Sequence, residues 1–345
     1  MDSAVRRLHD VGMTAALPAG LTVRSAELAD AEEIAAQMGA YTSALLGFPQ
    51  HSPENVADYL RDPAMDLATG SWLVHDGDKL VGSATAVRIA DRRQVDVDVF
   101  AADPAIAAWL FDTATEGAID RARADGLPDV RLHFGQLQQD ETAARLATAH
   151  GFTVTTSIQL MRIEHPTASR PAAARPTPER DSGIELPEPP AGVTLRVGAF
   201  DEATKRAAHA VIAGAFDTQP GSAPRPYDDW VASRESRSTF DWSQLAVAEL
   251  DGEPVGVREC SDTFLSSDNC NYIGRLGVLP QARGRGLAKF LLRDQFARDA
   301  AAGLTGTMLH VDSSNPTPAV GLYLGVGMRP TVITAIWEKS IPLAD

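Results

Sequence analysis

The sequence has little cysteine, few aromatic residues and no long apolar run. Only two of its 345 residues are cysteine, Cys260 and Cys270, too few for the disulfide framework of a small secreted protein, and we expect both to be free thiols. No apolar stretch approaches the roughly 20 residues that cross a bilayer. The first residues, Met1–Leu21, lack the apolar core of a secretory signal. The sequence therefore predicts a cytoplasmic protein without a membrane span.

Positive charge is also scarce. The chain has 31 lysine and arginine residues against 46 aspartate and glutamate residues, a formal net charge of −15 at pH 7. Nucleic acid and anionic membranes both select for clustered lysine and arginine, so neither is an expected partner. An anionic small molecule can still bind where backbone amides and a few arginines converge. A cationic amine would be favoured by the overall field.

The length suits two domains, and the same order of elements occurs twice. Each half has a short strand, an alanine-rich helical stretch, a hairpin, a further strand, a long helix, another strand and a last helix, at an offset of about 174 residues. Between the halves, residues 164–192 hold seven prolines and no hydrophobic period, which is typical of an extended linker. We predict an N-terminal domain over 20–164, a linker over 165–191 and a C-terminal domain over 192–342.

The pairing of neighbouring strands predicts the fold class. In the two hairpins, Asp76-Gly77 and Asp251-Gly252 would supply the two positive-φ positions of a tight turn. Strands that pair locally, with two helices that return to the sheet, indicate a mixed α/β domain whose helices cover both faces. We therefore expect two tandem domains, each a mixed, mostly antiparallel sheet flanked by helices.

The most informative segment runs from Val278 to Ala288. A strand that ends at Pro280 is followed by Arg283-Gly284-Arg285-Gly286 and then by a helical pattern. A glycine-rich turn that opens a helix suits a pyrophosphate, because unpaired N–H groups and the positive end of the helix dipole converge there. The Walker pattern needs Gly-Lys-Ser/Thr, and the dinucleotide fingerprint needs a third glycine where this chain has Lys289. The loop belongs to neither type.

Taken as a whole, this segment resembles the acyl-CoA loop of the GNAT acetyltransferase superfamily, Val-x-Pro-x-x-Arg-Gly-x-Gly-x-Ala, with every fixed position filled. Asn315, Leu322-Tyr323 and Gly327-Met328 resemble the family's Asn…Leu-Tyr-x-x-x-Gly-Phe ending. Methionine replaces the usual phenylalanine, and Asn315 stands one residue further from Ala319 than is common. Two such domains in one chain resemble the tandem members of the superfamily, mycothiol synthase among them.

The resemblance implies an acyl-CoA N-acyltransferase, with acetyl-CoA or another acyl-CoA as co-substrate. It would pass the acyl group directly to the amine of a small molecule, as a monomer or homodimer and without a metal. Loop amides would hold the pyrophosphate, the preceding strand would bond the pantetheine arm, and a β-bulge around Gly277 would aim an N–H at the thioester oxygen. Simple strand irregularity is the alternative for Gly274 and Gly277. The implied cofactor-binding residues are Leu276, Gly277, Val278, Arg283, Gly284, Arg285, Gly286, Leu287, Ala288 and Asn315.

Tyr323 matches the family tyrosine that protonates the coenzyme A thiolate. Its ordinary pKa of about 10 keeps the proton available at neutral pH. A core aromatic at the end of a helix is the alternative. Asn315 would bond the pantetheine, or serve as a helix cap before Pro316, or both.

The catalytic base is less clear, because the fourth strand lacks the carboxylate that many relatives place there. Glu259 on the third strand is the replacement we predict, on the face of Val255 and Val257. A salt bridge with Arg275 or Arg258 is the alternative. His310, Asp262 and a water chain are weaker candidates.

The polar region 218–241 lies where the family places its acceptor loops. The acidic residues in this region and directly before it, Asp217, Asp228, Asp229 and Asp241, would attract an amine or simply form a solvated face.

The N-terminal half lacks the chemical groups of the C-terminal half. Its counterpart of the loop, Val99–Ala107, has neither the arginine nor the paired glycines, and Asp103 is expected to cap a helix and oppose a phosphate. Residues 146–150, the counterpart of the Tyr323 region, contain no tyrosine. We therefore expect an active C-terminal domain and a structural N-terminal domain. A non-catalytic acyl-CoA-binding or sensing protein is the alternative.

Overall fold

The computed structural model of the protein describes residues 16–62, 64–88, 93–166, 186–217, 225–315 and 317–343. Most of the predicted linker (167–185), the start of the expected acceptor region (218–224) and Pro316 lie outside the described residues. The chain divides into two compact units. Unit 1 comprises Met1–Ser157 and Thr334–Asp345, and unit 2 comprises Ile158–Ile333. None of the described helices combines the length and the apolar composition that a bilayer-spanning helix needs.

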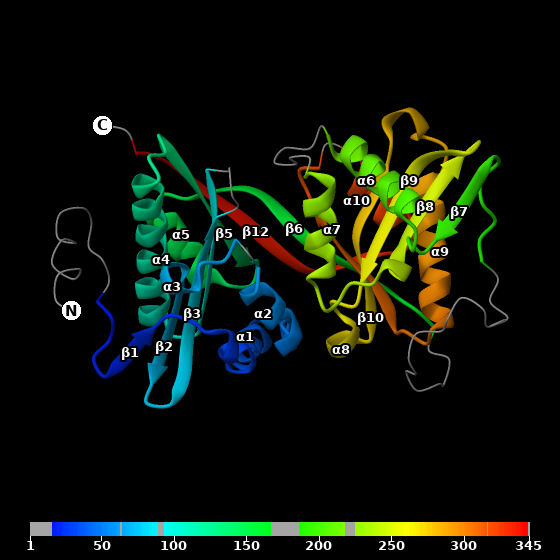
Figure 1. The fold of residues 1–345 in the computed structure, drawn as a ribbon. Coiled ribbons are helices and arrows are strands. Elements are labelled where there is room, and N and C mark those ends of the chain that lie inside the picture. The colour runs from blue at the N-terminus through cyan, green and yellow to red at the C-terminus, as the bar shows by residue number, and fades with distance from the viewer. Residues whose placement is uncertain are drawn as a thin grey trace. The chain divides into compact units, whose positions relative to one another are not determined.

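Unit 1 is a six-stranded sheet with helices on both faces (Figure 1). Its strand order is β1-β2-β3-β4-β5-β12, and every neighbouring pair is antiparallel except β4 and β5. The strands are β1 Leu21–Arg24, β2 Ser71–Asp76, β3 Lys79–Arg88, β4 Gln94–Ala101, β5 Asp129–Leu137 and β12 Arg329–Pro342. Helices α1 (Ala31–Leu46) and α2 (Pro53–Leu60) pack on one face, and α4 (Pro104–Ala124) and α5 (Glu141–Ala149) on the other. The short elements are η1 Leu28–Asp30 and α3 Leu67–Gly70.

Unit 2 repeats this plan with the order β7-β8-β9-β10-β11-β6, in which only β10 and β11 are parallel. Its strands are β7 Val193–Val197, β8 Leu245–Leu250, β9 Glu253–Ser261, β10 Cys270–Val278, β11 Gly306–Asp312 and β6 Thr153–Glu164. Its helices are α6 Glu202–Phe216, α7 Tyr227–Glu235, η2 Trp242–Gln244, α8 Leu265–Asp268, η3 Pro280–Ala282, α9 Leu287–Ala301 and α10 Ala319–Gly325. The predicted fold class, two mixed and mostly antiparallel α/β domains, is confirmed.

The last strand of each half pairs in the unit that the other half forms. Residues Thr334–Pro342 of β12 lie antiparallel to β5, whereas Ile158–Glu164 of β6 lie antiparallel to β11. The sequence-based boundaries of 20–164 and 192–342 differ from the units by this exchange. It arises because both strands are long, 12 and 14 residues, so that different parts of each strand belong to different units.

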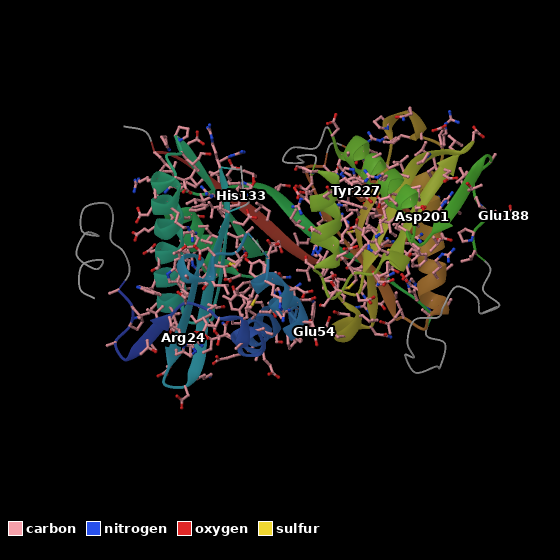
Figure 2. All side chains as sticks on the ribbon, in the orientation of Figure 1. Arg24, Glu54, His133, Glu188, Asp201 and Tyr227 are labelled. Carbon is pink, nitrogen blue, oxygen red and sulfur yellow. The ribbon has the colours of Figure 1, made fainter. Side chains whose placement is uncertain are left out.

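Hydrophobic cores on both faces hold the sheet of unit 2 between its helices (Figure 1). Val211 of α6 and Trp230 of α7 pack against Val257 of β9 on one face. Leu291 of α9 packs against Val255 and Val278 on the other face. Asp201 accepts a hydrogen bond from the Thr204 N–H at 2.8 Å and so begins α6 (Figure 2). Cys260 and Cys270 are buried free thiols, as predicted.

The two hairpin turns differ. Asp251 and Gly252 both have positive φ, 53° and 88°, as the sequence predicts. In the other hairpin Asp76 pairs with Lys79, so the turn residues are Gly77 and Asp78. The prediction placed this turn one residue too early, because Asp76 is still part of the strand and Gly77 alone takes the positive φ.

Candidate active site

A tight loop joins the end of β10 to α9. The turn Pro280–Ala282 comes first, and Gly286 is the N-cap of the helix. Gly284 and Gly286 have φ values of 77° and 80°, a conformation that favours glycine. A Cβ atom at either position would meet no other atom within 4 Å. The loop therefore leaves open space beside its backbone.

Backbone N–H groups of this loop have no acceptor within the described part of the chain. The first bond inside α9 runs from the Phe290 N–H to the Gly286 carbonyl at 2.9 Å, so the N–H groups of 287–289 have no partner within the helix. No side chain caps the helix, and the amides of 284–286 likewise donate no hydrogen bond among the described residues. The helix dipole adds positive potential at the same place, so the loop fits a pyrophosphate.

The side chain of Arg283 supports the loop. Its Nε donates to the Val278 carbonyl at 3.1 Å, and its Nη2 donates to the Ala215 carbonyl of α6 at 3.1 Å. The Arg283 N–H donates within the preceding turn, to the Pro280 carbonyl at 3.3 Å. Arg283 thus fixes the loop to β10 and α6, and the free amides begin at Gly284.

The parallel strands β10 and β11 stay paired for only three residues. Cys270–Tyr272 pair with Gly306–Met308, and no further pair of these strands follows in the described chain. The rest of β10, including Leu276–Val278, pairs with β9 alone. A gap in the sheet therefore opens beside the residues expected to bond the pantetheine arm.

The β-bulge lies at Gly274. The register of β10 against β9 shifts between Ile273 and Arg275, whereas Gly277 lies in regular register. The predicted bulge around Gly277 is therefore wrong by three residues. Gly277 is required by packing, because a Cβ atom there would lie 3.0 Å from the Cβ of Ala215 on α6.

Tyr323 lies on α10 with only 9% of its surface exposed, in the core that also contains Ile273 and Met328. Burial, with a smaller contribution from the nearby Tyr272, raises the pKa of Tyr323 to about 12. The hydroxyl therefore keeps its proton at neutral pH. Asn315 Oδ1 accepts hydrogen bonds from the Thr317 N–H at 3.0 Å and hydroxyl at 2.7 Å, which orders the turn before α10.

Glu259 forms a buried ion pair with Arg234 of α7. Its Oε2 accepts from Arg234 Nη2 at 2.7 Å and from Nε at 2.9 Å, and the side chains are 6% and 3% exposed, respectively. The predicted alternative, a salt bridge, is thus present with another partner than expected. Arg258 instead bonds Asp294 of α9 at 2.8 Å. The sequence did not single out Arg234, because only the packing of α7 on the sheet brings it to Glu259.

Of the two valines predicted to share the face of Glu259 on β9, only one does so. Val257 shares this face, since both contact the α6 and α7 side. Val255 packs with Leu291 of α9 on the opposite face. The reason is a register shift in the β8–β9 pairing between Ala248 and Glu249, which breaks the alternation.

His310 lies on β11 beyond the part that pairs with β10. Its Nδ1 is 2.9 Å from the Tyr272 hydroxyl. Its ring centroid is 5.5 Å from that of Tyr272 and 6.3 Å from that of Phe264. The residue is exposed, but desolvation of the ring by these neighbours lowers the pKa of His310 from its ordinary value, so the imidazole is neutral at pH 7. Asp262 follows β9, and its N–H donates to the Thr239 carbonyl at 2.7 Å.

The acidic residues of the expected acceptor region do not form one cluster on a single element. Asp228 and Asp229 lie exposed in the first turn of α7, beside Tyr227, whose hydroxyl donates to Glu202 at 3.0 Å (Figure 2). Asp241 accepts from the Ser243 N–H at 2.8 Å and caps η2. These contacts give Asp241 a structural role.

In unit 1 a carboxylate takes the place of the open loop. Asp103 Oδ1 accepts from the N–H groups of Ala105 at 2.7 Å and Ile106 at 3.3 Å, which confirms the predicted cap of α4. The positive end of this helix is thus already matched by a negative charge. His150, in the region that corresponds to Tyr323, bonds Asp112 at 2.6 Å.

Comparisons with known proteins agree with this geometry. Residues 215–328 match the model of the acetyltransferase (GNAT) family. Mycothiol acetyltransferase of Frankia casuarinae is 33% identical over 301 residues, which cover 84% of this chain and 80% of that protein. Mycothiol acetyltransferase of Frankia alni is 32% identical, over 72% of this chain and 70% of that one. The chain belongs to the GNAT acetyltransferase family.

Solved structures show the same tandem fold. A GCN5-related N-acetyltransferase from Sphaerobacter thermophilus superposes with a TM-score of 0.75 at 24% identity, over 95% of this chain and 98% of that chain. A tandem GNAT protein from the clavulanic acid biosynthesis pathway gives a TM-score of 0.66 at 15% identity, over 93% and 98% of the two chains. The predicted tandem GNAT type is thereby confirmed.

The loop gives a first prediction. Gly286→Asp should weaken acetyl-CoA binding by about 100-fold or more, because a carboxylate would face the pyrophosphate at the free amides. Calorimetric titration of the full chain measures this affinity. Gly252→Asp is the matched control: Gly252 also has positive φ (88°) and open space, but lies in a hairpin turn. Equal affinity in both variants would show that the loop is not the coenzyme site.

Proposed function

We propose that the chain is an acyl-CoA-dependent N-acyltransferase that moves an acetyl group directly to the amine of a small molecule. In this proposal the C-terminal half is active and the N-terminal half is structural. The observation that carries it is the contrast between the helix starts: α9 offers free amides next to two open glycines, whereas Asp103 fills that position on α4. The Frankia relatives are named mycothiol acetyltransferases, so a mycothiol-related amine is the first acceptor to test.

In this proposal, different segments of the chain bind different parts of the acyl-CoA. A bound acyl-CoA supplies a reactive thioester and a thiolate leaving group. The N–H groups of 284–289 would hold its pyrophosphate. The edge of β10 next to the gap would bond the pantetheine arm through main-chain groups of Leu276 and Val278, and Asn315 would orient the end of β11.

Tyr323 is the proposed acid. Its pKa of about 12 leaves the hydroxyl protonated, so it can donate a proton to a thiolate as the thioester bond breaks. The same burial removes competing water from the hydroxyl. A protein that only binds acyl-CoA has no need of such a group.

His310 is the base that the geometry favours. Its neutral imidazole can accept the proton of the amine, and it lies at the gap between β10 and β11. Glu259, the predicted base, has its Oε2 occupied by two hydrogen bonds from Arg234. We therefore assign Glu259 mainly to positioning α7 against the sheet.

The second candidate function is a non-catalytic acyl-CoA-binding or sensing protein. The observation that favours it is the sequestered Glu259, together with the lack of a carboxylate on β10. Turnover separates the two functions, because a sensor would bind acyl-CoA without releasing a thiol in the presence of an amine.

The proposed function is tested by an amine screen with acetyl-, propionyl- and succinyl-CoA that measures thiol release. Wild-type protein should turn over at least one amine with acetyl-CoA. Tyr323→Phe should then lower kcat by about 100-fold, a typical contribution of a general acid, while leaving acetyl-CoA affinity unchanged. Tyr59→Phe removes a hydroxyl in unit 1 and should have no effect. A full rate in Tyr323→Phe would rule out the acid role, and no turnover with any amine would favour the sensor.

The base gives a pH prediction. A base acts unprotonated, so kcat/KM should fall as the pH drops through the pKa of His310, which lies below 6.5. This fall of kcat/KM at low pH should be absent in His310→Gln, whose kcat/KM should be lower by about 100-fold or more. The fall should persist in Glu259→Gln. An acceptor whose amine pKa is known allows the titration of the amine to be distinguished from that of the catalytic base. If the fall of kcat/KM at low pH disappeared only in Glu259→Gln, Glu259 would be the base.

A further inference from the structure

Three arginines, Arg234, Arg237 and Arg275, lie on the α7 side of unit 2, and one of them is paired with Glu259. Arg275 of β10 pairs directly with Glu259 of β9, and residues opposite each other on neighbouring strands project to the same face. Arg234 reaches Glu259 from α7. Arg275 therefore lies on the same side of the sheet as the buried ion pair.

The bulge at Gly274 also brings Tyr272 to this face. Tyr272 pairs with Ser261, two residues from Glu259 on β9, so it projects to the same side as Glu259. In a regular strand Tyr272 and Arg275, three residues apart, would face opposite sides. Because the bulge adds one residue, Arg275 stands next to the tyrosine that contacts His310.

Arg237 approaches from the segment that follows α7. Its N–H donates to the Arg234 carbonyl at 3.1 Å, and two residues later the Thr239 carbonyl accepts from Asp262 N–H at 2.7 Å. These bonds hold the segment against the end of β9, next to Ser261, the partner of Tyr272.

The titration of nearby groups agrees with this placement. Burial lowers the pKa of Arg234 to about 10, against the opposing effect of Glu259, and the positive charges of Arg275 and Arg237 lower it further. Burial raises the pKa of Tyr272 to about 12, and the same two arginines act in the opposite direction. Both arginines are thus within electrostatic reach of Tyr272.

Two guanidinium groups at this face form no ion pair with a carboxylate of the described residues. Glu259 is already bonded to Arg234. Arg237 and Arg275 are exposed, and neither has a carboxylate oxygen within 4.0 Å among the described residues. In a chain with a net charge of −15, two exposed arginines that stay unpaired beside a catalytic gap are available to an external anion.

We infer that the acceptor amine carries an oxyanion group, a carboxylate or a phosphate, which Arg275 and Arg237 bind beside Tyr272. The inference rests on the proposed function, because it takes the gap between β10 and β11 as the place of acyl transfer. Guanidinium groups match the geometry of both oxyanions, and the bond is charge-assisted. The arginines would hold the anionic end of the acceptor on the α7 side of the gap, and His310 would meet its amine.

Matched pairs of amines test the inference. Phosphoethanolamine is compared with ethanolamine, and a series of amino acids with their carboxamides, by kcat/KM with acetyl-CoA. Wild-type protein should prefer the anionic member of at least one pair by about tenfold or more. Arg275→Gln and Arg237→Gln should each reduce this preference, because each lowers kcat/KM for the anionic member more than for the neutral member. Arg293→Gln, an exposed arginine on α9, is the control and should keep the preference.

The phosphoethanolamine–ethanolamine pair tests for a phosphate on the acceptor, and the pairs of amino acid and carboxamide test for a carboxylate. Equal rates for both members of every pair, or a preference that survives in the Arg275→Gln, Arg237→Gln double variant, would overturn the inference. If no amine is acetylated, the proposed function fails, and calorimetric binding of the anionic members decides the anion site. Binding that is lost in the double variant and kept in Arg293→Gln supports the site; no binding, or binding that the double variant keeps, overturns it.

Discussion

The early separation of β10 from β11 is the constraint on which the site depends. Parallel strands that remained paired would close the sheet, but these two pair only over Cys270–Tyr272 and Gly306–Met308. In the proposed site, the groups that would act on the substrates are the free amides at the start of α9, the protonated hydroxyl of Tyr323 and the neutral ring of His310. The bulge at Gly274 then sets the side chains of Tyr272 and Arg275 on one face of β10. In the proposed site, the separation of the two strands and the bulge would together arrange the coenzyme side and the acceptor side.

Two halves with the same strand order show which features belong to the fold and which to the chemistry. The parallel pair β4–β5 covers only Gln94–Val97 with Arg131–Phe134 and corresponds to β10–β11, so the partial pairing is common to both units. The helix starts differ, because Asp103 caps α4 with its own carboxylate, whereas Gly286 leaves the first amides of α9 without an acceptor in the described chain. The exchange of β6 and β12 makes each unit need a strand from the other half. The N-terminal half therefore has a structural role in unit 2, as the proposed division of labour requires.

The fold and the loop could be predicted from the sequence, since both depend on local patterns. Positive-φ glycines before a helix have a local signature, and so has the cap at Asp103. The site's long-range features could not be predicted. Glu259 was expected to meet Arg258 or Arg275, but the alternation of β9 sends Arg258 to Asp294, and the packing of α7 brings in Arg234 from 25 residues away. The bulge was assigned to Gly277, because a glycine required by packing looks the same in sequence as a glycine required by a bulge. The faces of Val255 and Arg275 follow from register shifts that have no signature in a single sequence.

The central claim is that one acyl-CoA site, at the start of α9, serves the chemistry. Native mass spectrometry of the full chain with acetyl-CoA counts bound molecules, and a chase with isotopically labelled acetyl-CoA shows which of them exchange. The account predicts one exchangeable molecule per chain, absent when the loop is altered at Gly286; any second molecule would stay unexchanged through the chase. Two molecules that exchange equally, or one that still exchanges in the altered loop, would contradict it and place coenzyme binding in the other half of the chain.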